Sequence, residues 1–147
     1  MIYIVDEDVG QLRPLECELR LRGHRVEILR NADLAFAALS SCKDAEIAII
    51  DVMLAVKDGA DGSRYGIEET DEGVTTGLCF LEDLAKFNEA FFPKHAAILT
   101  QASRPQVLAK IEAACKLHRI PFWRKITFQT VFDLADTIET QMKAIKG

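Results

Sequence analysis

One short apolar run limits the folds open to this chain more than any other feature of its sequence. Residues 45–50 read AEIAII, and they lead directly into a carboxylate, Asp51. A run that is almost continuously apolar, without alternation, is typical of a strand buried on both faces. Such strands belong to parallel sheets that are covered by helices on both sides. The run therefore predicts an α/β fold with Asp51 at the carboxyl end of a buried strand.

Segments with strand and helix patterns alternate along the rest of the chain. Strands are predicted at residues 2–5, 26–29, 45–50, 95–100 and 120–125. Helices are predicted at about residues 9–22, 31–40, 75–91, 103–117 and 127–146, with Asn31 and a capping box at Ser103 as start signals. The apolar stripe of the last helix is assigned to the core. Five alternating pairs favour a doubly wound parallel sheet of strand order 2-1-3-4-5.

The length and net charge of the chain limit the classes of function that it can have. The chain has 147 residues, which predicts one domain over residues 1–147, and its net charge of −5 argues against a nucleic-acid reader. No apolar run approaches the length of a membrane span, so we expect a cytoplasmic protein without membrane contact. The four cysteines show no metal-site spacing. They are expected to be small buried hydrophobic residues.

Chemically capable side chains follow four of the five predicted strands. In parallel α/β sheets, ligands bind outside the carboxyl ends of the strands, and the predicted order makes these four strands neighbours. The side chains are therefore expected to converge on one shallow site. They are Asp6, Glu7 and Asp8 after the first strand, Asp51 after the third, Thr100 after the fourth and Lys125 after the fifth.

The chemistry of this group suggests phosphoryl transfer. Several carboxylates at one rim repel each other unless a cation lies among them, and oxygen ligands favour Mg²⁺. A carboxylate beside Mg²⁺ is able to attack phosphorus and form an aspartyl phosphate. Lys125 and Thr100 are of the types that would hold phosphoryl oxygens.

At this point the sequence resembles the receiver domain of two-component response regulators. The resemblance covers essentially the whole chain and implies a flavodoxin-like (βα)5 fold. The motifs that carry it stand in family order: IYIVDED, AEIAIIDVML, TGLCFLEDL, AAILTQAS and PFWRK.

The resemblance implies a role for each matching residue. Asp51 would be the phosphoacceptor, and Asp6 and Glu7 the acidic pair that holds Mg²⁺ together with the backbone carbonyl of Met53. Thr100 would be the switch hydroxyl and Lys125 the lysine of the site. Phe122 would occupy the aromatic switch position. The expected partners are a histidine kinase or phosphotransfer protein and a downstream protein target, with self-phosphorylation and autodephosphorylation as the only catalysis.

The sequence departs from the family pattern in two places near Asp51. Gln101 stands after the switch threonine, where the family commonly has a small residue. An acidic, glycine-containing insertion occupies about residues 55–76, with Ala55 in place of the usual proline. The stretch that begins at Asp58 fails the EF-hand pattern, because Ala60 and Ser63 fill positions that need an acid and a glycine. A lid or docking surface beside Asp51 is the functional hypothesis for this insertion, and a solvated loop is the simpler one.

Two other functions remain open from the residues alone. The segment IVDEDVG also resembles the first motif of haloacid-dehalogenase-type phosphatases, in which Asp6 would be the nucleophile and Asp8 the acid/base. A pseudo-receiver would keep the pocket as a binding module without using phosphorylation. Phe128 and Phe132 are four residues apart on the predicted last helix, where they would form a homodimer face or pack inward.

Overall fold

The computed structural model describes residues 1–54, 64–66, 70 and 73–147 of the chain. Its parallel sheet has the order β2-β1-β3-β4-β5. The strands are β1 (Ile2–Val5), β2 (Val26–Leu29), β3 (Ile47–Ile50), β4 (Ala96–Thr100) and β5 (Phe122–Arg124). The helices are α1 (Val9–Leu21), α2 (Ala32–Leu39), α3 (Thr76–Phe87), α4 (Pro105–His118) and α5 (Val131–Lys146), with a 3-10 turn η1 (Lys125–Thr127). The predicted flavodoxin-like fold and its strand order are confirmed.

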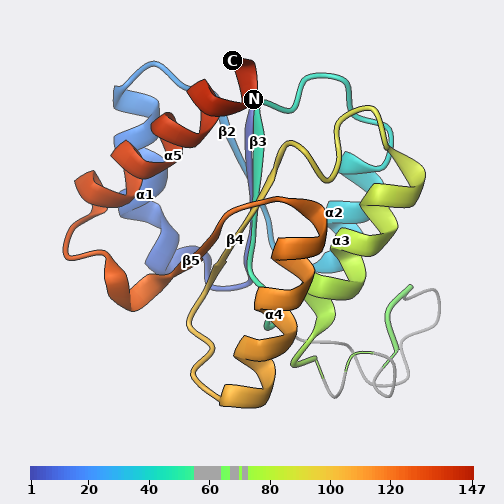
Figure 1. Ribbon diagram of the computed structural model, residues 1–147. Helices are drawn as coiled ribbons and strands as arrows, with labels where there is room; N and C mark the ends of the chain where they lie inside the picture. The colour runs from blue at the N-terminus through green and yellow to red at the C-terminus, as the bar shows by residue number, and fades with distance from the viewer. Residues whose placement is uncertain (55–63, 67–69, 71–72) are drawn as a thin grey trace.

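Helices cover both faces of the sheet (Figure 1). α1 and α5 lie together on one face, and α2, α3 and α4 cover the other. The side chains of β3 alternate between the two cores, because Ile47 and Ile49 belong to the cluster under α1 and α5. Ala48 and Ile50 belong to the cluster on the opposite face. The apolar run is therefore buried on both faces, as predicted.

The stripe of α5 is part of the core. Ala135, Ile138, Met142 and Ile145 are buried, and they pack with residues of α1 and the sheet. The aromatic pair before and within this helix behaves differently. Phe128 precedes α5 and packs against the same cluster, whereas Phe132 is 59% exposed. The prediction that both lie on the last helix is wrong, because α5 begins at Val131 after the cap residue Thr130.

Several predicted element ends are also wrong. α3 stops at Phe87 rather than near residue 91, because the Asn88 side chain donates hydrogen bonds to the Leu39 and Cys42 carbonyl oxygens. Ser103 does not cap α4. The residue before Pro105 is held in extended backbone, so Arg104 is the N-cap and makes no side-chain cap hydrogen bond. The strand predicted at residues 120–125 forms only over Phe122–Arg124.

Capping by Asn31 is confirmed, since its Oδ1 accepts a hydrogen bond from the Leu34 backbone N–H. The prediction for the cysteines is only partly right. Cys115 is buried, Cys42 and Cys79 are half-buried, and Cys17 is exposed. All four are free thiols. Among the described residues, no helix is both long and apolar enough to cross a membrane.

Part of the predicted insertion is packed against the helices. Tyr65 is 2% exposed, and its hydroxyl donates to Asp83 Oδ2 over 2.9 Å. Arg64 Nε lies 2.7 Å from the same oxygen, and its guanidinium lies 4.0 Å above the Phe36 ring of α2. These two residues join α2 and α3, so a fully solvated insertion is excluded at Arg64 and Tyr65. The rejected EF-hand stretch at residues 58–63 lies outside the described residues.

Candidate functional site

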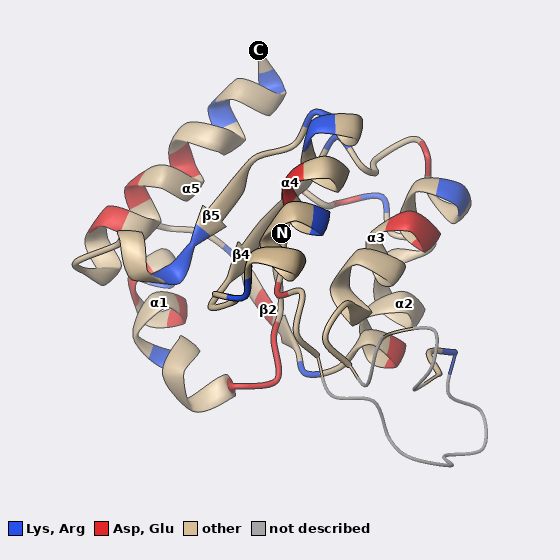
Figure 2. Cartoon of the chain, turned by 60° about the horizontal axis from the view of Figure 1, so that its bottom comes forward, with Lys and Arg blue, Asp and Glu red and all other residues tan. Residues whose placement is uncertain are grey.

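The predicted site residues meet at the carboxyl edge of the sheet. Asp6 follows β1, Asp51 follows β3, Thr100 ends β4 and Lys125 follows β5. These four strands are neighbours, so parallel pairing brings their ends to one side. Figure 2 shows the acidic connection between β1 and α1 and the basic segment after β5 at this end of the sheet.

Lys125 joins the two buried carboxylates. Its Nζ lies 2.7 Å from Asp6 Oδ2 and 3.7 Å from Asp51 Oδ2. Asp6 is only 3% exposed and Asp51 9%, so this one ammonium group is held between two acids with little water around them. Electrostatic interactions are strengthened by such burial. The cluster therefore has a strong local requirement for positive charge.

The pKa of Asp51 reflects its burial and the charges around it. Burial raises this pKa most, the nearby charge of Asp6 raises it as well, and the net result is a shift from 3.8 to about 6. Lys125 opposes the shift, as do hydrogen bonds from the Met53 backbone and the Thr100 side chain. Losing water and facing a second acid thus outweigh the single lysine. A further cation near Asp51 would relieve both effects.

Thr100 and Met53 surround Asp51 from two segments. The Met53 backbone N–H donates to Asp51 Oδ1 over 3.3 Å, and the Met53 side chain is 41% exposed. Thr100 is fully buried, and its Oγ1 accepts a hydrogen bond from the Ala102 backbone N–H. Phe122 is half-buried on β5 and packs against the core under α2, α3 and α4.

A cavity of about 220 Å³ opens over the carboxylates. Its lining residues are Asp6, Glu7, Asp8, Asp51, Met53, Gln101 and Lys125. Every residue predicted to hold Mg²⁺ is therefore on its wall, although Glu7 is exposed. In the part of the chain that the structure describes, no three His, Cys, Asp or Glu side chains are grouped closely enough to hold a metal by themselves.

Asp8 already has a structural role. Its Oδ1 accepts a hydrogen bond from the Gln11 backbone N–H and caps α1, while its own N–H donates to Asp6 Oδ1 over 3.0 Å. An N-cap carboxylate satisfies one of the free N–H groups at the start of a helix. This arrangement orients Asp6 toward Lys125 and gives Asp8 a role other than acid/base catalysis.

The first turn of α3 touches the backbone at Asp51 and Val52. Gly77 N–H donates to the Val52 carbonyl oxygen over 2.8 Å. A Cβ added at Gly77 would lie 2.2 Å from the Asp51 carbonyl oxygen and 2.6 Å from the Val52 Cα, so only glycine fits here. Reading strand ends did not find this residue. The available signal was a glycine within the first turn of a predicted helix, where it lowers helix propensity.

Sequence comparisons give no relative: no family model matches the chain, and no curated protein matches it. Structural comparison finds proteins with the same fold. A CheY-like response regulator receiver domain protein from Methanospirillum hungatei JF-1 superposes with a TM-score of 0.68 at 18% identity, over 99% of this chain and 94% of that chain.

Two more receiver domains superpose equally fully. The receiver domain of NtrX from Brucella abortus gives a TM-score of 0.66 at 19% identity, over 97% of this chain and 98% of that chain. The receiver domain of the Francisella response regulator 1452 gives 0.66 at 15% identity, with 97% and 96% covered. The chain therefore has the fold of response regulator receiver domains over nearly its whole length.

Proposed function

We propose that this chain is a phosphoacceptor receiver domain in which Asp51 takes a phosphoryl group from a histidine kinase or phosphotransfer protein. The observation that supports this most is the position of Lys125 between Asp6 and Asp51 in an acidic cavity at the strand ends. The receiver fold places that cavity where α/β sheets bind ligands. The fold and the residue chemistry support the same function.

In the proposed reaction, a carboxylate oxygen of Asp51 attacks the phosphorus of a phosphohistidine. The new O–P bond forms as the N–P bond breaks, and the bonding electron pair stays on the imidazole nitrogen. With its pKa at about 6, Asp51 is mostly ionised at pH 7, as a nucleophile must be. Lys125 is close enough to bind a phosphoryl oxygen in place of part of its contact with Asp51.

The donor set fits Mg²⁺. Asp6, Asp51 and the Met53 carbonyl would hold the ion with waters, and Glu7 lies on the same wall to bind through one of them. These ligands are all oxygen atoms, and a cation beside Asp51 would offset the burial and the Asp6 charge that raise its pKa. When bound, Mg²⁺ would neutralise phosphoryl charge during transfer.

The response to phosphorylation is proposed to pass through Thr100 and Phe122. Thr100 already contributes a hydrogen bond that lowers the pKa of Asp51, so its hydroxyl is near enough to turn toward a phosphoryl oxygen. That turn would exchange its present bond with Ala102. Phe122, half-buried at the start of β5, would follow into the space released and alter a surface that a downstream protein target recognises.

Radiolabelled acetyl phosphate with Mg²⁺ tests this proposal on wild type, Asp51→Asn and Asp6→Asn. We expect an acid-stable, base-labile adduct that Asp51→Asn abolishes and Asp6→Asn weakens. Steady phosphate release that depends on Asp6 would instead favour the phosphatase. No adduct, even with a phosphorylated histidine donor protein, would favour the pseudo-receiver, for which the bulk of Gln101 on the cavity wall is the specific observation.

A further inference from the structure

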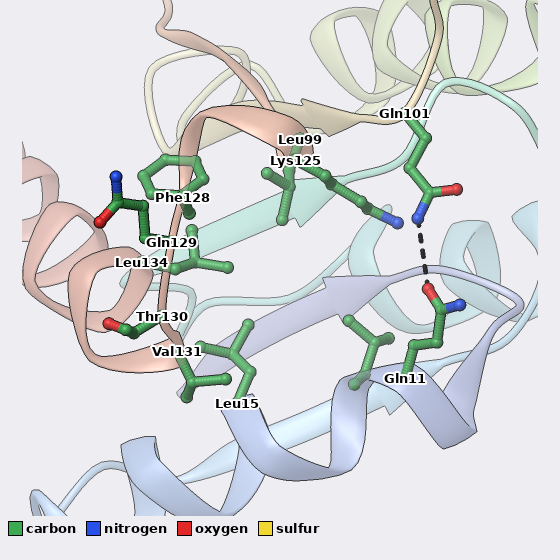
Figure 3. Close-up of a pocket in the computed structure, with 11 residues that line it drawn as sticks. Gln11, Leu15, Leu99, Gln101, Lys125, Phe128, Gln129, Thr130, Val131 and Leu134 are labelled. Atoms are coloured by element: carbon green, nitrogen blue, oxygen red, sulfur yellow. Dashed lines mark hydrogen bonds between the residues drawn. The ribbon is translucent and has the colours of Figure 1, made fainter.

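The phosphoacceptor cavity has a neighbour with which it shares a wall. A groove of about 280 Å³ lies between α1, the end of β4 and the start of α5. Its lining is partly apolar and includes Leu12. Leu15, Leu99 and Leu134, which also line it, are labelled in Figure 3. Gln101 and Lys125 line both the groove and the cavity above Asp51. A change at either residue therefore alters access to both spaces.

A hydrogen bond crosses this shared wall. Gln101 Nε2 donates to Gln11 Oε1 over 3.2 Å, which joins the β4–α4 connection to α1 (Figure 3). Gln11 lines the groove but does not line the phosphoacceptor cavity. Its side chain is therefore connected to the cavity through the hydrogen bond with Gln101.

Both ends of this bridge are attached to the site. The backbone N–H of Gln11 is bound by the cap carboxylate of Asp8, which also orients Asp6. Gln101 directly follows Thr100, whose hydroxyl holds the next peptide at Ala102. The bridge thus spans two segments whose backbones are fixed by residues of the phosphoacceptor site, and only its two side chains are free to open.

We propose that the Gln11–Gln101 bridge is a latch that holds the Gln101 side chain over the cavity and limits access to Asp51. A phosphodonor reaches the carboxylate when the bridge opens and Gln101 turns toward the groove, which has room for it. Gln11 is a positioning residue in this scheme. The inference rests on the proposed phosphorylation for its biological meaning, but access to Asp51 is measurable without it.

The expected effect is modest because both side chains are exposed. A hydrogen bond of ordinary net strength corresponds to about a two- to tenfold change in the population of the open state. Loss of the bridge is therefore expected to raise the rate of Asp51 modification by about two- to tenfold. The stability of the fold should not change, since neither side chain belongs to a core cluster.

Gln101 can limit access to Asp51 by its bulk alone or through its bond with Gln11. Variants of matched side-chain length separate these two effects. Gln11→Met and Gln101→Met keep the size of the side chain but remove the amide, and methionine also preserves the helix propensity at Gln11 in α1. Gln101→Ala removes both bulk and bridge. Gln129→Met changes a third glutamine on the groove wall and serves as the control. Urea unfolding of each variant confirms that it is folded.

Access is measured by labelling with a water-soluble carbodiimide and an amine at pH 6, with Asp51 quantified by mass spectrometry against exposed Glu112 as internal standard. Gln11→Met and Gln101→Met should both label Asp51 about two- to tenfold faster than wild type and Gln129→Met. Acceleration in Gln101→Ala alone would show that Gln101 acts by bulk and would overturn the latch, as would equal rates in all variants. Faster labelling in a protein that neither acetyl phosphate nor a phosphorylated histidine donor protein modifies would retain the latch and reject the phosphoacceptor function.

Discussion

The contact between Gly77 and the Asp51 peptide makes Gly77→Ala an informative substitution. A methyl group here would lie 2.2 Å from the Asp51 carbonyl oxygen and 2.6 Å from the Val52 Cα, well inside the sum of van der Waals radii. Both opposing atoms belong to backbone, which cannot swing aside as a side chain can. Either α3 or the segment after β3 must therefore move.

The magnitude follows from two opposing terms. Forcing a methyl group into a packed site costs about 1–3 kcal/mol. Replacing glycine by alanine in a helix gains up to about 1 kcal/mol, and less in a first turn. We expect Gly77→Ala to lower the free energy of unfolding by about 1–2 kcal/mol. Because displacement of a reacting group by ~1 Å can cost ~100-fold in rate, phosphorylation of Asp51 should fall at least about tenfold.

Gly10→Ala is the matched control. Gly10 lies in α1, and the nearest atom to an added Cβ is Asp8 Oδ1 at 4.0 Å, an ordinary contact. Because Gly10 also lies in a first turn, the same chemical change should stabilise the protein by up to about 0.5 kcal/mol. Urea unfolding at pH 7.5 measures both free energies, and acetyl phosphate labelling measures the rate. The reasoning would be refuted if Gly77→Ala were as stable as wild type and were phosphorylated at the same rate.

Three further substitutions test the charges and hydrogen bonds around the site. Burial and the nearby charge of Asp6 raise the pKa of Asp51 from 3.8 to about 6, so the ionised carboxylate destabilises the fold above pH 6. In chelator, Asp51→Asn should then raise the free energy of unfolding by about 2–3 kcal/mol at pH 7.5, an advantage that shrinks as the pH falls from 6 to 4. Tyr65→Phe keeps the buried ring but loses the bond to Asp83, and urea unfolding should show a loss of about 1 kcal/mol. Thr76→Val removes the buried hydroxyl that donates to the Leu54 carbonyl over 2.7 Å, with an expected loss of about 1–3 kcal/mol in the same assay.

The fold could be predicted because its determinants are local. The run at Ile47–Ile50 has no alternation, and its residues do divide between two cores on opposite faces. Element ends were less predictable because they depend on distant partners. α3 ends where Asn88 bonds to carbonyl oxygens at the end of α2, and nothing in the sequence around Asn88 indicates that contact.

The grouping of Asp6, Asp51 and Lys125 could be predicted for a topological reason. Parallel strands put all their carboxyl ends at one edge, so the chemistry of the edge can be read once the strand order is known. The bond between Gln11 and Gln101 and the burial of Tyr65 follow from tertiary packing instead. Tyr65 lies in a segment rich in acids and glycine, and its environment is supplied by α3.

The insertion can be long without displacing Asp51, because hydrogen bonds hold the two ends of the insertion together. Gly77 N–H binds the Val52 carbonyl, and Thr76 Oγ1 binds that of Leu54, so the chain returns to the place it left. The entropic cost of closing a loop grows slowly with its length, by about 0.6 kcal/mol for each doubling. The two hydrogen bonds and the packing of α3 offset a cost of that size. Because the returning segment touches the Asp51 peptide itself, the position of Asp51 depends on both β3 and the start of α3.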